Sequence, residues 1–143
     1  MLIGEYKHTI DSKKRLAIPA KFRKELGLKA VVTRGIDKCL FVYPLKEWEV
    51  FAEKLVKLPV WKSNNRNFSR VMLAGAQDVE TDSLGRIIIP EYLKQYAGLS
   101  KKVVIAGLYN RLEIWDENSW KDHQSNAERS AGEIAEKLSE LGI

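Results

Sequence analysis

Two aspartate–arginine pairs with the same spacing are the residues of this chain best placed to do chemistry. Asp11 precedes Arg15 by four positions, and Asp82 precedes Arg86 by four positions. Two carboxyl groups brought together could act as a general acid and a general base. A guanidinium close to each carboxylate favours the charged form, however, which is the wrong state for an acid. We therefore expect each aspartate to hold a turn and to form an ion pair with its arginine.

The first pair encloses a cluster of positive charge that the second pair lacks. Lys13, Lys14 and Arg15 are consecutive, whereas residues 83–85 carry no charge. Three cations at the end of a tight turn cannot all avoid solvent, and they would suit the phosphates of DNA. Lysines bind phosphates as point charges, while an arginine fork fits guanine O6 and N7. The candidate DNA-binding residues are Lys7, His8, Lys13, Lys14, Arg15 and Arg86, although His8 also reads as an ordinary polar surface residue.

The rest of the chain offers no catalytic or metal-binding constellation. His8 and His123 are far apart in the sequence, and Cys39 has no evident partner base. The glycine loops with which nucleotide-binding proteins hold phosphates are also missing. We therefore expect neither an enzyme nor a bound cofactor or metal ion.

The distribution of charge supports a binding role. Residues 1–71 contain 16 Lys and Arg against 7 Asp and Glu, whereas residues 72–143 contain 8 against 12. A basic half is the electrostatic footprint of a nucleic-acid-binding surface, although a merely solvated surface would carry similar charge. No apolar run is long enough to span a membrane, charged residues begin at Glu5, and Cys39 is the single cysteine. We therefore expect a cytoplasmic protein.

The aspartates and arginines belong to a longer internal repeat. Residues 11–28 match residues 82–99 at seven of eighteen positions, with a constant offset of 71. Unrelated segments of this length would match at about one position. Neither half alone would bury a generous core. The repeat therefore predicts two related units, residues 1–71 and 72–143, that interleave as one β-rich structural domain.

The local signals follow the same order in both units. Each unit reads as strand, turn, strand, short helix and hairpin, followed by a longer helix. Pro19 and Pro90 are expected to start the short helices, where no backbone N–H is needed. Gly85 suits a turn position with positive φ, which Lys14 at the matching place fits less well. Residues 87–89, all isoleucine, read as a strand buried on both faces.

Longer amphipathic helices are expected over residues 45–58 and 123–141. In each segment apolar residues recur at helical spacing and the remaining face is polar. The carboxy-terminal helix could pack on its own domain or on a neighbouring subunit, and the sequence leaves both arrangements open.

Several of these features together resemble the MraZ family of bacterial regulators. They are the doubled Asp-x-x-x-Arg with a proline four residues on, the ββαββ order, and a tandem layout over nearly the whole chain. Residues 1–6, Met-Leu-Ile-Gly-Glu-Tyr, and residues 82–87, Asp-Ser-Leu-Gly-Arg-Ile, are particularly similar to that family. The family belongs to the AbrB-like, swapped-hairpin group of DNA-binding proteins.

The resemblance implies a specific version of the predicted fold. It is a β-rich α+β protein, a double-split (swapped-hairpin) β-barrel built from two tandem ββαββ-helix repeats, with an additional C-terminal helix. The two halves would form a pseudo-dimer within one chain. The residues matched to the family's motif are the aspartates Asp11 and Asp82, the arginines Arg15 and Arg86, and the prolines Pro19 and Pro90.

The resemblance also implies a function. The chain would be a sequence-specific regulator that binds double-stranded DNA at direct repeats in the promoter of the division and cell-wall gene cluster. It would assemble into a homo-oligomer, a closed, octamer-like ring, and would be associated with the nucleoid rather than with a membrane.

An AbrB-like assembly or antitoxin-type module is the alternative. In such a protein the amphipathic helices bind a protein partner, and DNA contact is secondary. An antitoxin of this kind usually wraps its toxin with a disordered tail, whereas residues 123–141 read as an ordered helix.

Overall fold

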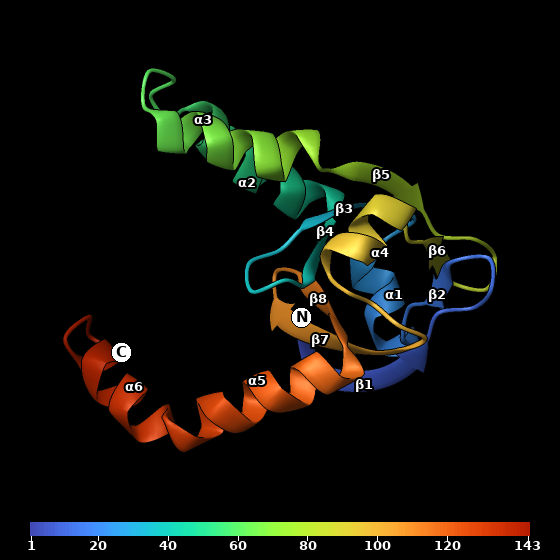
Figure 1. Ribbon diagram of the computed structural model, residues 1–143. Coiled ribbons are helices and arrows are strands. Elements are labelled where there is room, and N and C mark those ends of the chain that lie inside the picture. Colours follow the sequence, from blue (N-terminus) through green and yellow to red (C-terminus); the bar gives the residue numbers. More distant parts are fainter.

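The computed structural model describes all 143 residues, and its elements recur in the same order in the two halves (Figure 1). The first half contains β1 (Leu2–Thr9), β2 (Arg15–Ala17), α1 (Ala20–Leu26), β3 (Lys29–Arg34), β4 (Leu40–Pro44), α2 (Leu45–Val56), α3 (Ser63–Ser69) and the π-helical turn η1 (Arg70–Ala74). The second contains β5 (Gln77–Glu80), β6 (Arg86–Ile88), α4 (Glu91–Tyr96), β7 (Lys102–Tyr109), β8 (Leu112–Asp116), α5 (Glu117–Arg129) and α6 (Ala131–Ser139). The predicted ββαββ order followed by helix is confirmed in both halves.

The strands form one large sheet and one small ribbon. Six strands pair antiparallel in the order β1-β7-β8-β4-β3-β5, and β2 pairs with β6 as a separate two-stranded ribbon. Strands from different halves pair at β1–β7, β3–β5, β4–β8 and β2–β6. When each strand is replaced by its counterpart in the other half (β1 by β5, β3 by β7, β4 by β8), the same strand order results, read from the opposite edge. The sheet therefore has a pseudo-twofold axis between β4 and β8. The β-rich α+β prediction thus agrees with a mixed structure dominated by an antiparallel sheet.

The central strands are buried on both faces. In β4, Leu40 and Val42 face a core cluster of 20 residues that also includes the buried side of the ribbon, α1 and α4. Phe41 and Tyr43 face the other way, into a second cluster to which α2, η1 and β8 contribute. Alternation between two apolar layers explains why the sequence of β4 is apolar throughout.

The ribbon, by contrast, is buried on one face only. Ile87 and Ile89 are fully buried, but Ile88 between them is 58% exposed. The prediction that residues 87–89 are buried on both faces is therefore wrong. The reason is that a two-stranded ribbon lying over one core has no second layer to cover its outer face, so its side chains alternate between core and solvent.

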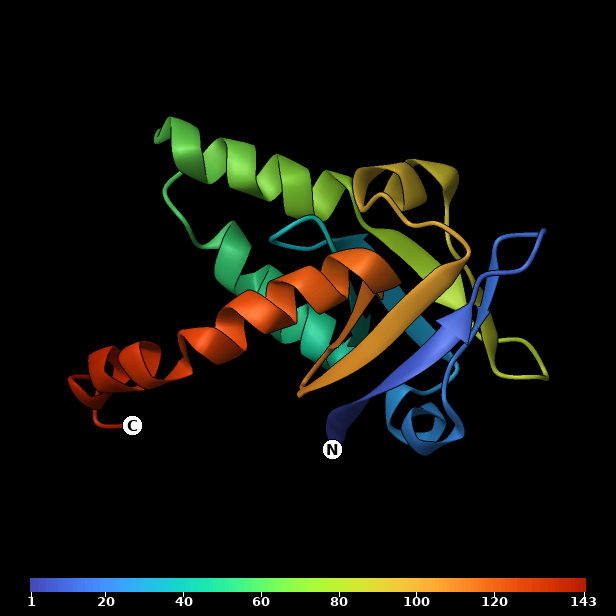
Figure 2. The same ribbon diagram turned by 60° about the horizontal axis from the view of Figure 1, so that its bottom comes forward.

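The carboxy-terminal helix also differs from the prediction. It is interrupted at Ser130, which separates α5 from α6, and no residue of α6 is buried. Figures 1 and 2 show α6 extending away from the sheet, on the same side of the molecule as the far end of α3. In this structure α6 therefore does not pack on its own domain.

The short helices begin one residue later than predicted. Pro19 and Pro90 are the residues just before α1 and α4, and both have extended backbone angles. Each proline still ends a strand and fixes the entry into a helix, as the sequence indicated. None of the helices combines the length and the hydrophobicity needed to cross a bilayer.

The packing of Arg23 against the second turn can be tested at the turn glycine, Gly85. Gly85 has a φ of 73°, and a β-carbon there would collide with the side chain of Arg23. Gly98 also has a positive φ, 59°, but open space around it. We expect Gly98→Ala to lower the free energy of unfolding by about 1 kcal/mol through backbone strain. Gly85→Ala should cost about 2–3 kcal/mol, because the hydrogen bond from Arg23 to the Ile18 carbonyl is also disturbed.

Urea unfolding of both variants at one fixed protein concentration measures the difference. Equal losses for the two variants would show that the Arg23 contact contributes nothing to stability.

Candidate nucleic-acid interface

Each turn is closed by its aspartate in the same way. Asp11 Oδ1 accepts from the backbone N–H of Lys13 and of Arg15, both at 2.9 Å, and Oδ2 accepts from Arg15 Nε at 2.7 Å. In the second turn Asp82 makes the matching bonds to Leu84 and Arg86 at the same distances. The predicted roles of the two aspartates, turn closure and an ion pair with arginine, are confirmed.

These hydrogen bonds keep both aspartates charged. The backbone N–H of Arg15, followed by its guanidinium, holds the pKa of Asp11 below its ordinary value. The corresponding groups of Arg86 lower the pKa of Asp82. Neither carboxyl group is therefore suited to donate a proton near neutral pH, and both serve instead to shape the turns.

The two turns are also bound to each other's strands. Ile18 donates its N–H to the Gly85 carbonyl at 2.9 Å, and Ile89 donates its N–H to the Lys14 carbonyl at 2.8 Å. Lys14 has a φ of 62°, close to the 73° of Gly85, so a lysine occupies the left-handed position that favours glycine. Figures 1 and 2 show that the two turns project side by side from one end of the molecule.

The outer face of the ribbon carries both motif arginines. Arg15 pairs with Ile88 and Ala17 pairs with Arg86, while Leu16 and Ile87 between them are fully buried. Arg15 and Arg86 are therefore diagonal neighbours on the outer face, where such residues lie roughly 7–8 Å apart. Each arginine uses Nε for its aspartate, and the terminal nitrogens of both make no hydrogen bond. Two guanidinium groups thus lie on one outer face, with the Arg15 side chain 30% and the Arg86 side chain 27% exposed.

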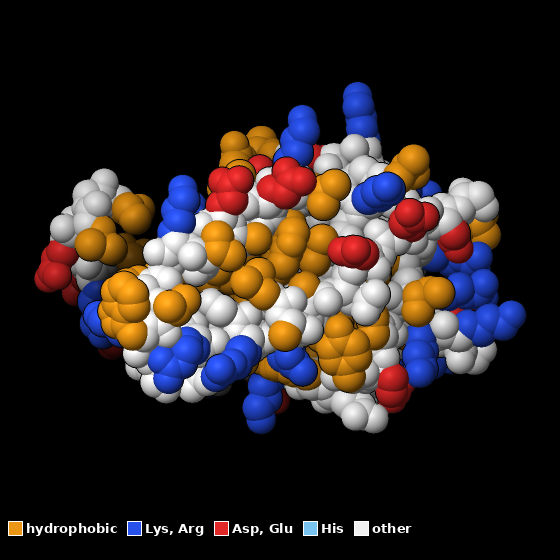
Figure 3. Space-filling view, turned by 90° about the horizontal axis from the view of Figure 1, so that it is seen from above, with side chains coloured by type: hydrophobic (Ala, Val, Ile, Leu, Met, Phe, Trp, Pro, Cys, Tyr) orange, Lys and Arg blue, Asp and Glu red, His pale blue; other side chains and the backbone are white.

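Further cations come together beside the first turn from distant parts of the chain. A groove of about 590 Å³ is lined by Thr9, Ile10, Asp11, Ser12, Lys94, Ser100 and Lys101. Figure 3 shows Lys and Arg side chains gathered at the end of the molecule from which the turns project. Lys94 and Lys101 are not among the residues that the sequence patterns indicated. The repeat contained a signal for Lys94, because Lys94 corresponds to another cation, Arg23, at the offset of 71. The sequence contains no such signal for Lys101, which is placed by a backbone contact between Ile10 and Lys101.

The predicted DNA-binding residues differ in how accessible they are. Lys7 and Lys13 are exposed and make no ion pair, whereas Lys14 is paired with Glu91. His8 is half-buried on the opposite face of β1 from Lys7. Burial, followed by the nearby charge of Arg23, lowers the pKa of His8, so this side chain is neutral near pH 7. His8 is therefore a weaker candidate for a phosphate contact than the lysines.

The flank of the second turn is acidic. Asp78 of β5 stands where the first half has Lys7, and Glu80 stands where it has Thr9. Both acids line a groove of about 340 Å³ together with the exposed Ile88. The two turns therefore have nearly identical backbones but different charged neighbours, because two acids flank the second turn, where the side chain of Arg23 is the adjacent cation.

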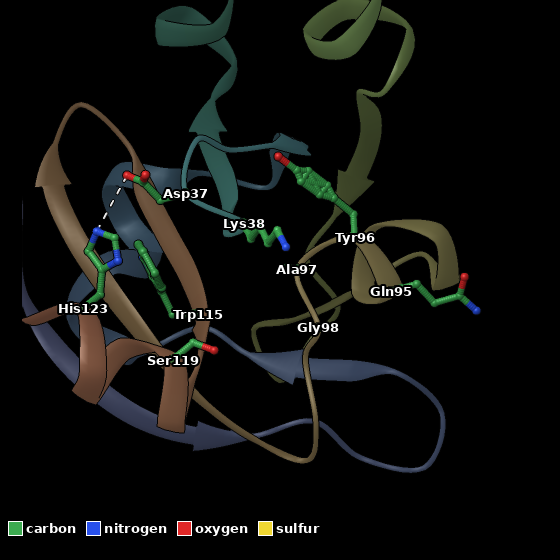
Figure 4. A pocket seen from close by; sticks show the side chains of 9 residues that line it. All are labelled: Asp37, Lys38, Gln95, Tyr96, Ala97, Gly98, Trp115, Ser119 and His123. Carbon is green, nitrogen blue, oxygen red and sulfur yellow. Dashed lines mark ion pairs between the residues drawn. The ribbon is translucent and has the colours of Figure 1, made fainter.

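A separate cavity of about 350 Å³ lies between the β3–β4 loop, α4 and α5 (Figure 4). Figure 4 shows His123 beside Trp115 and directed toward Asp37 at 3.8 Å, with Lys38 reaching in from the loop. Cys39, next to this loop, is buried, and burial raises the pKa of its thiol. No three of the His, Cys, Asp and Glu side chains form a group that could hold a metal ion. None of the predicted DNA-binding residues lines this cavity.

Known proteins resemble the chain over its whole length. The family described as "MraZ protein, putative antitoxin-like" matches residues 1–71 and again residues 72–140. The chain is 51% identical over 143 residues, all of both chains, to a protein of Caldicellulosiruptor bescii named "Transcriptional regulator MraZ". Proteins of the same name from Halothermothrix orenii and Natranaerobius thermophilus are 52% and 50% identical over the same full length.

The closure of the turns by aspartate predicts how stability depends on pH. A carboxyl group whose pKa is lowered by folding stabilises the protein above the ordinary aspartate pKa, and that stability is lost as the pH falls through the folded-state value. We expect Asp11→Asn and Asp82→Asn to be less stable than the wild type at neutral pH and to lose less of their stability in acid. Urea midpoints measured between neutral pH and about pH 3 test this, since unperturbed aspartates titrate near pH 4.

Asp122→Asn is the matched control, because Asp122 is exposed on α5 and makes no ion pair. If the acid-induced loss were the same in all three variants, the turn aspartates would not be its source.

Proposed function

The chain belongs to the MraZ family, and from this premise we propose that it is a transcriptional regulator that binds double-stranded DNA with its turn end. The observation that carries the proposal is the outer face of the β2–β6 ribbon, where Arg15 and Arg86 present free terminal nitrogens beside the cations of the first turn. A two-stranded ribbon is one of the elements that the DNA major groove admits.

Lysines and arginines have different roles in this proposal. Lys13 lies exposed at the tip of the first turn, and Lys94 and Lys101 line the groove beside it, so these lysines would bind phosphates and set the position of the protein. Arg15 and Arg86 would read base edges, because a planar fork can donate two hydrogen bonds to one guanine. The second turn would contribute mainly Arg86, since Asp78 and Glu80 repel phosphate.

Further features complete the proposal. The target would be direct repeats in the promoter of the division and cell-wall gene cluster, which places the protein at the nucleoid. Residues 1–71 and 72–143 would be two AbrB-like repeats interleaved as one structural domain, with the sheet and ribbon together forming the double-split barrel. The pairings between halves support this reading of the repeat.

Self-association is proposed from the helices at the other end of the molecule. Between α2 and α3 lies a groove of about 210 Å³, whose lining includes Leu55 and Val60, and Trp61 beside it is 80% exposed. Residues 54–70 contain five Lys and Arg and no acid, whereas residues 128–143 contain four Glu and two Lys and Arg. We propose that α6 of one copy lies in the α2–α3 groove of the next. A contact between two different surfaces generates a ring when the rotation closes.

This use of the apolar helices leaves the alternative function less support. An antitoxin-type module would also need an exposed apolar surface, and Figure 3 shows hydrophobic side chains at several places on the α2–α3 side. The complementary charge of α6 favours a second copy of the chain as the occupant. Capture of a different protein in stoichiometric amount by the α2–α3 surface would favour the alternative.

The DNA-binding proposal predicts different effects for arginine and lysine. Arg15→Ala should reduce discrimination between the selected site and random duplex by about 1–3 kcal/mol, because base contacts are lost. Lys13→Gln should weaken binding to all sequences alike and reduce the slope of log K against log salt by about 1. Binding of selected and random duplexes over a salt series measures both quantities.

Arg129→Ala is the control, since Arg129 is an arginine at the far end of α5. Binding that depends on neither Arg15 nor Lys13 would refute the proposed interface.

The assembly proposal predicts a change in mass. Trp61→Ser and Ile134→Ser should each reduce the particle to smaller species, because each removes apolar surface from one side of the α6 contact. Leu84→Ser changes another exposed apolar residue, 60% accessible compared with 80% for Trp61 and 45% for Ile134, in the second turn and should leave the mass unchanged. Light scattering after size-exclusion chromatography reports the masses, and a wild type that is monomeric at micromolar concentration would end this proposal.

A further inference from the structure

An acid is built into the surface beside the cationic first turn. Lys14 Nζ lies 2.9 Å from Glu91 Oε2, and both side chains are partly exposed. The backbone brings the two residues together, because the Lys14 carbonyl accepts the N–H of Ile89, two positions before Glu91. Glu91 is the first residue of α4 and also accepts a hydrogen bond from Gln95 at 3.4 Å. The contact therefore follows from the way the two halves are joined.

The pair has no counterpart in the other half of the repeat. At the offset of 71, Lys14 corresponds to Gly85 and Glu91 corresponds to Ala20. Neither residue is needed for the backbone geometry, which the two turns share. The lysine and the glutamate are thus a feature of the first turn alone, found on the side that faces the cations.

An ion pair at this position competes with phosphate for the same ammonium group. Lys13, one residue earlier, makes no ion pair and is free to displace a counterion from DNA. Lys14 can do so only if its contact with Glu91 is broken, and the carboxylate left behind would then lie close to the phosphates. Because affinity for DNA rises with the number of phosphates neutralised, a paired lysine contributes less than a free one.

We infer that Glu91 is a positioning residue that withholds Lys14 from the DNA backbone and so keeps the affinity of each first turn low for all sequences. The inference rests on the DNA-binding role proposed above. Weak single contacts make stable binding depend on several subunits engaging several sites at once, because effective concentration then supplies the affinity. Glu91 thereby links the strength of one turn to the need for repeated sites.

Glu91→Gln tests the inference directly. Affinity for a random-sequence duplex should rise roughly threefold to tenfold at low salt, as expected when one unit charge is removed and another is freed. The slope of log K against log salt should steepen by about 0.9, because one more phosphate is neutralised. In a Lys14→Gln background the same substitution should give only the smaller gain that follows from removing an acid.

Glu80→Gln is the matched control for that smaller gain. Glu80 is an exposed acid of β5 that makes no ion pair, so its loss changes net charge without freeing a lysine. Thermal unfolding of each variant separates a change in the interface from a loss of folded protein. A purely structural role for Glu91 at the start of α4 would change the unfolding temperature and leave the salt slope as it is.

The outcomes distinguish this inference from the proposed function. If the wild type binds DNA in a manner that depends on Arg15, but Glu91→Gln leaves affinity and salt slope unchanged or resembles Glu80→Gln, the inference is wrong and the DNA-binding role stands. If the wild type binds no duplex over the salt series, both are wrong. A gain in affinity larger than that of Glu80→Gln, together with a steeper salt slope, seen only in proteins that retain Lys14, would support the inference.

Discussion

The structure depends on the way each turn is held by the other half of the chain. The N–H of Ile18 bonds to Gly85, and the N–H of Ile89 bonds to Lys14, so neither turn completes its hydrogen bonds within its own repeat. The paired strands β2 and β6 are only three residues long, and a ribbon so short is not stable alone. Its buried face, which includes Leu16 and Ile87, makes it part of the main core. The two turns therefore form one rigid surface rather than two independent loops.

This shared backbone allows the two turns to carry different side chains on the same geometry. Asp11 and Asp82 fix the same geometry with the same three hydrogen bonds, and its left-handed position is occupied by Lys14 in the first turn and by Gly85 in the second. The first tip has lysines and a basic flank, while the second has Leu84, Gly85 and an acidic flank. A pseudo-symmetric scaffold thus carries an asymmetric charge distribution. In the proposed DNA-binding role, such a surface would fit a directional site better than a palindrome, because the halves of a palindrome require equal contacts.

Sequence patterns predicted the features that depend on neighbours along the chain. The resemblance drawn from the doubled motif is confirmed by the family matches, and the turn aspartates, the hairpins and the ββαββ order follow from local signals. The patterns failed where a residue's surroundings come from the other half. Ile88 is exposed because nothing covers the outer face of the ribbon, and Lys14 has a positive φ in a turn whose carbonyl accepts the N–H of Ile89 from the other half. Lys101 is brought to the first turn only by the pairing of β1 with β7.

The turn end of the molecule brings like charges together, whereas the helical end leaves apolar side chains in water, and assembly of several copies would address both. At the turn end, like charges repel one another, and one of them is paired with Glu91, which would limit what a single copy contributes to the proposed DNA binding. At the helical end, Trp61 and the apolar side of α6 are left in water, although a helix of nine residues is marginal without a packed face. Assembly of several copies would bury the helices and would also multiply the weak turns along one duplex. The exposed helices and the paired lysine are each a disadvantage only for a single chain, and both would be explained if the protein worked as an array.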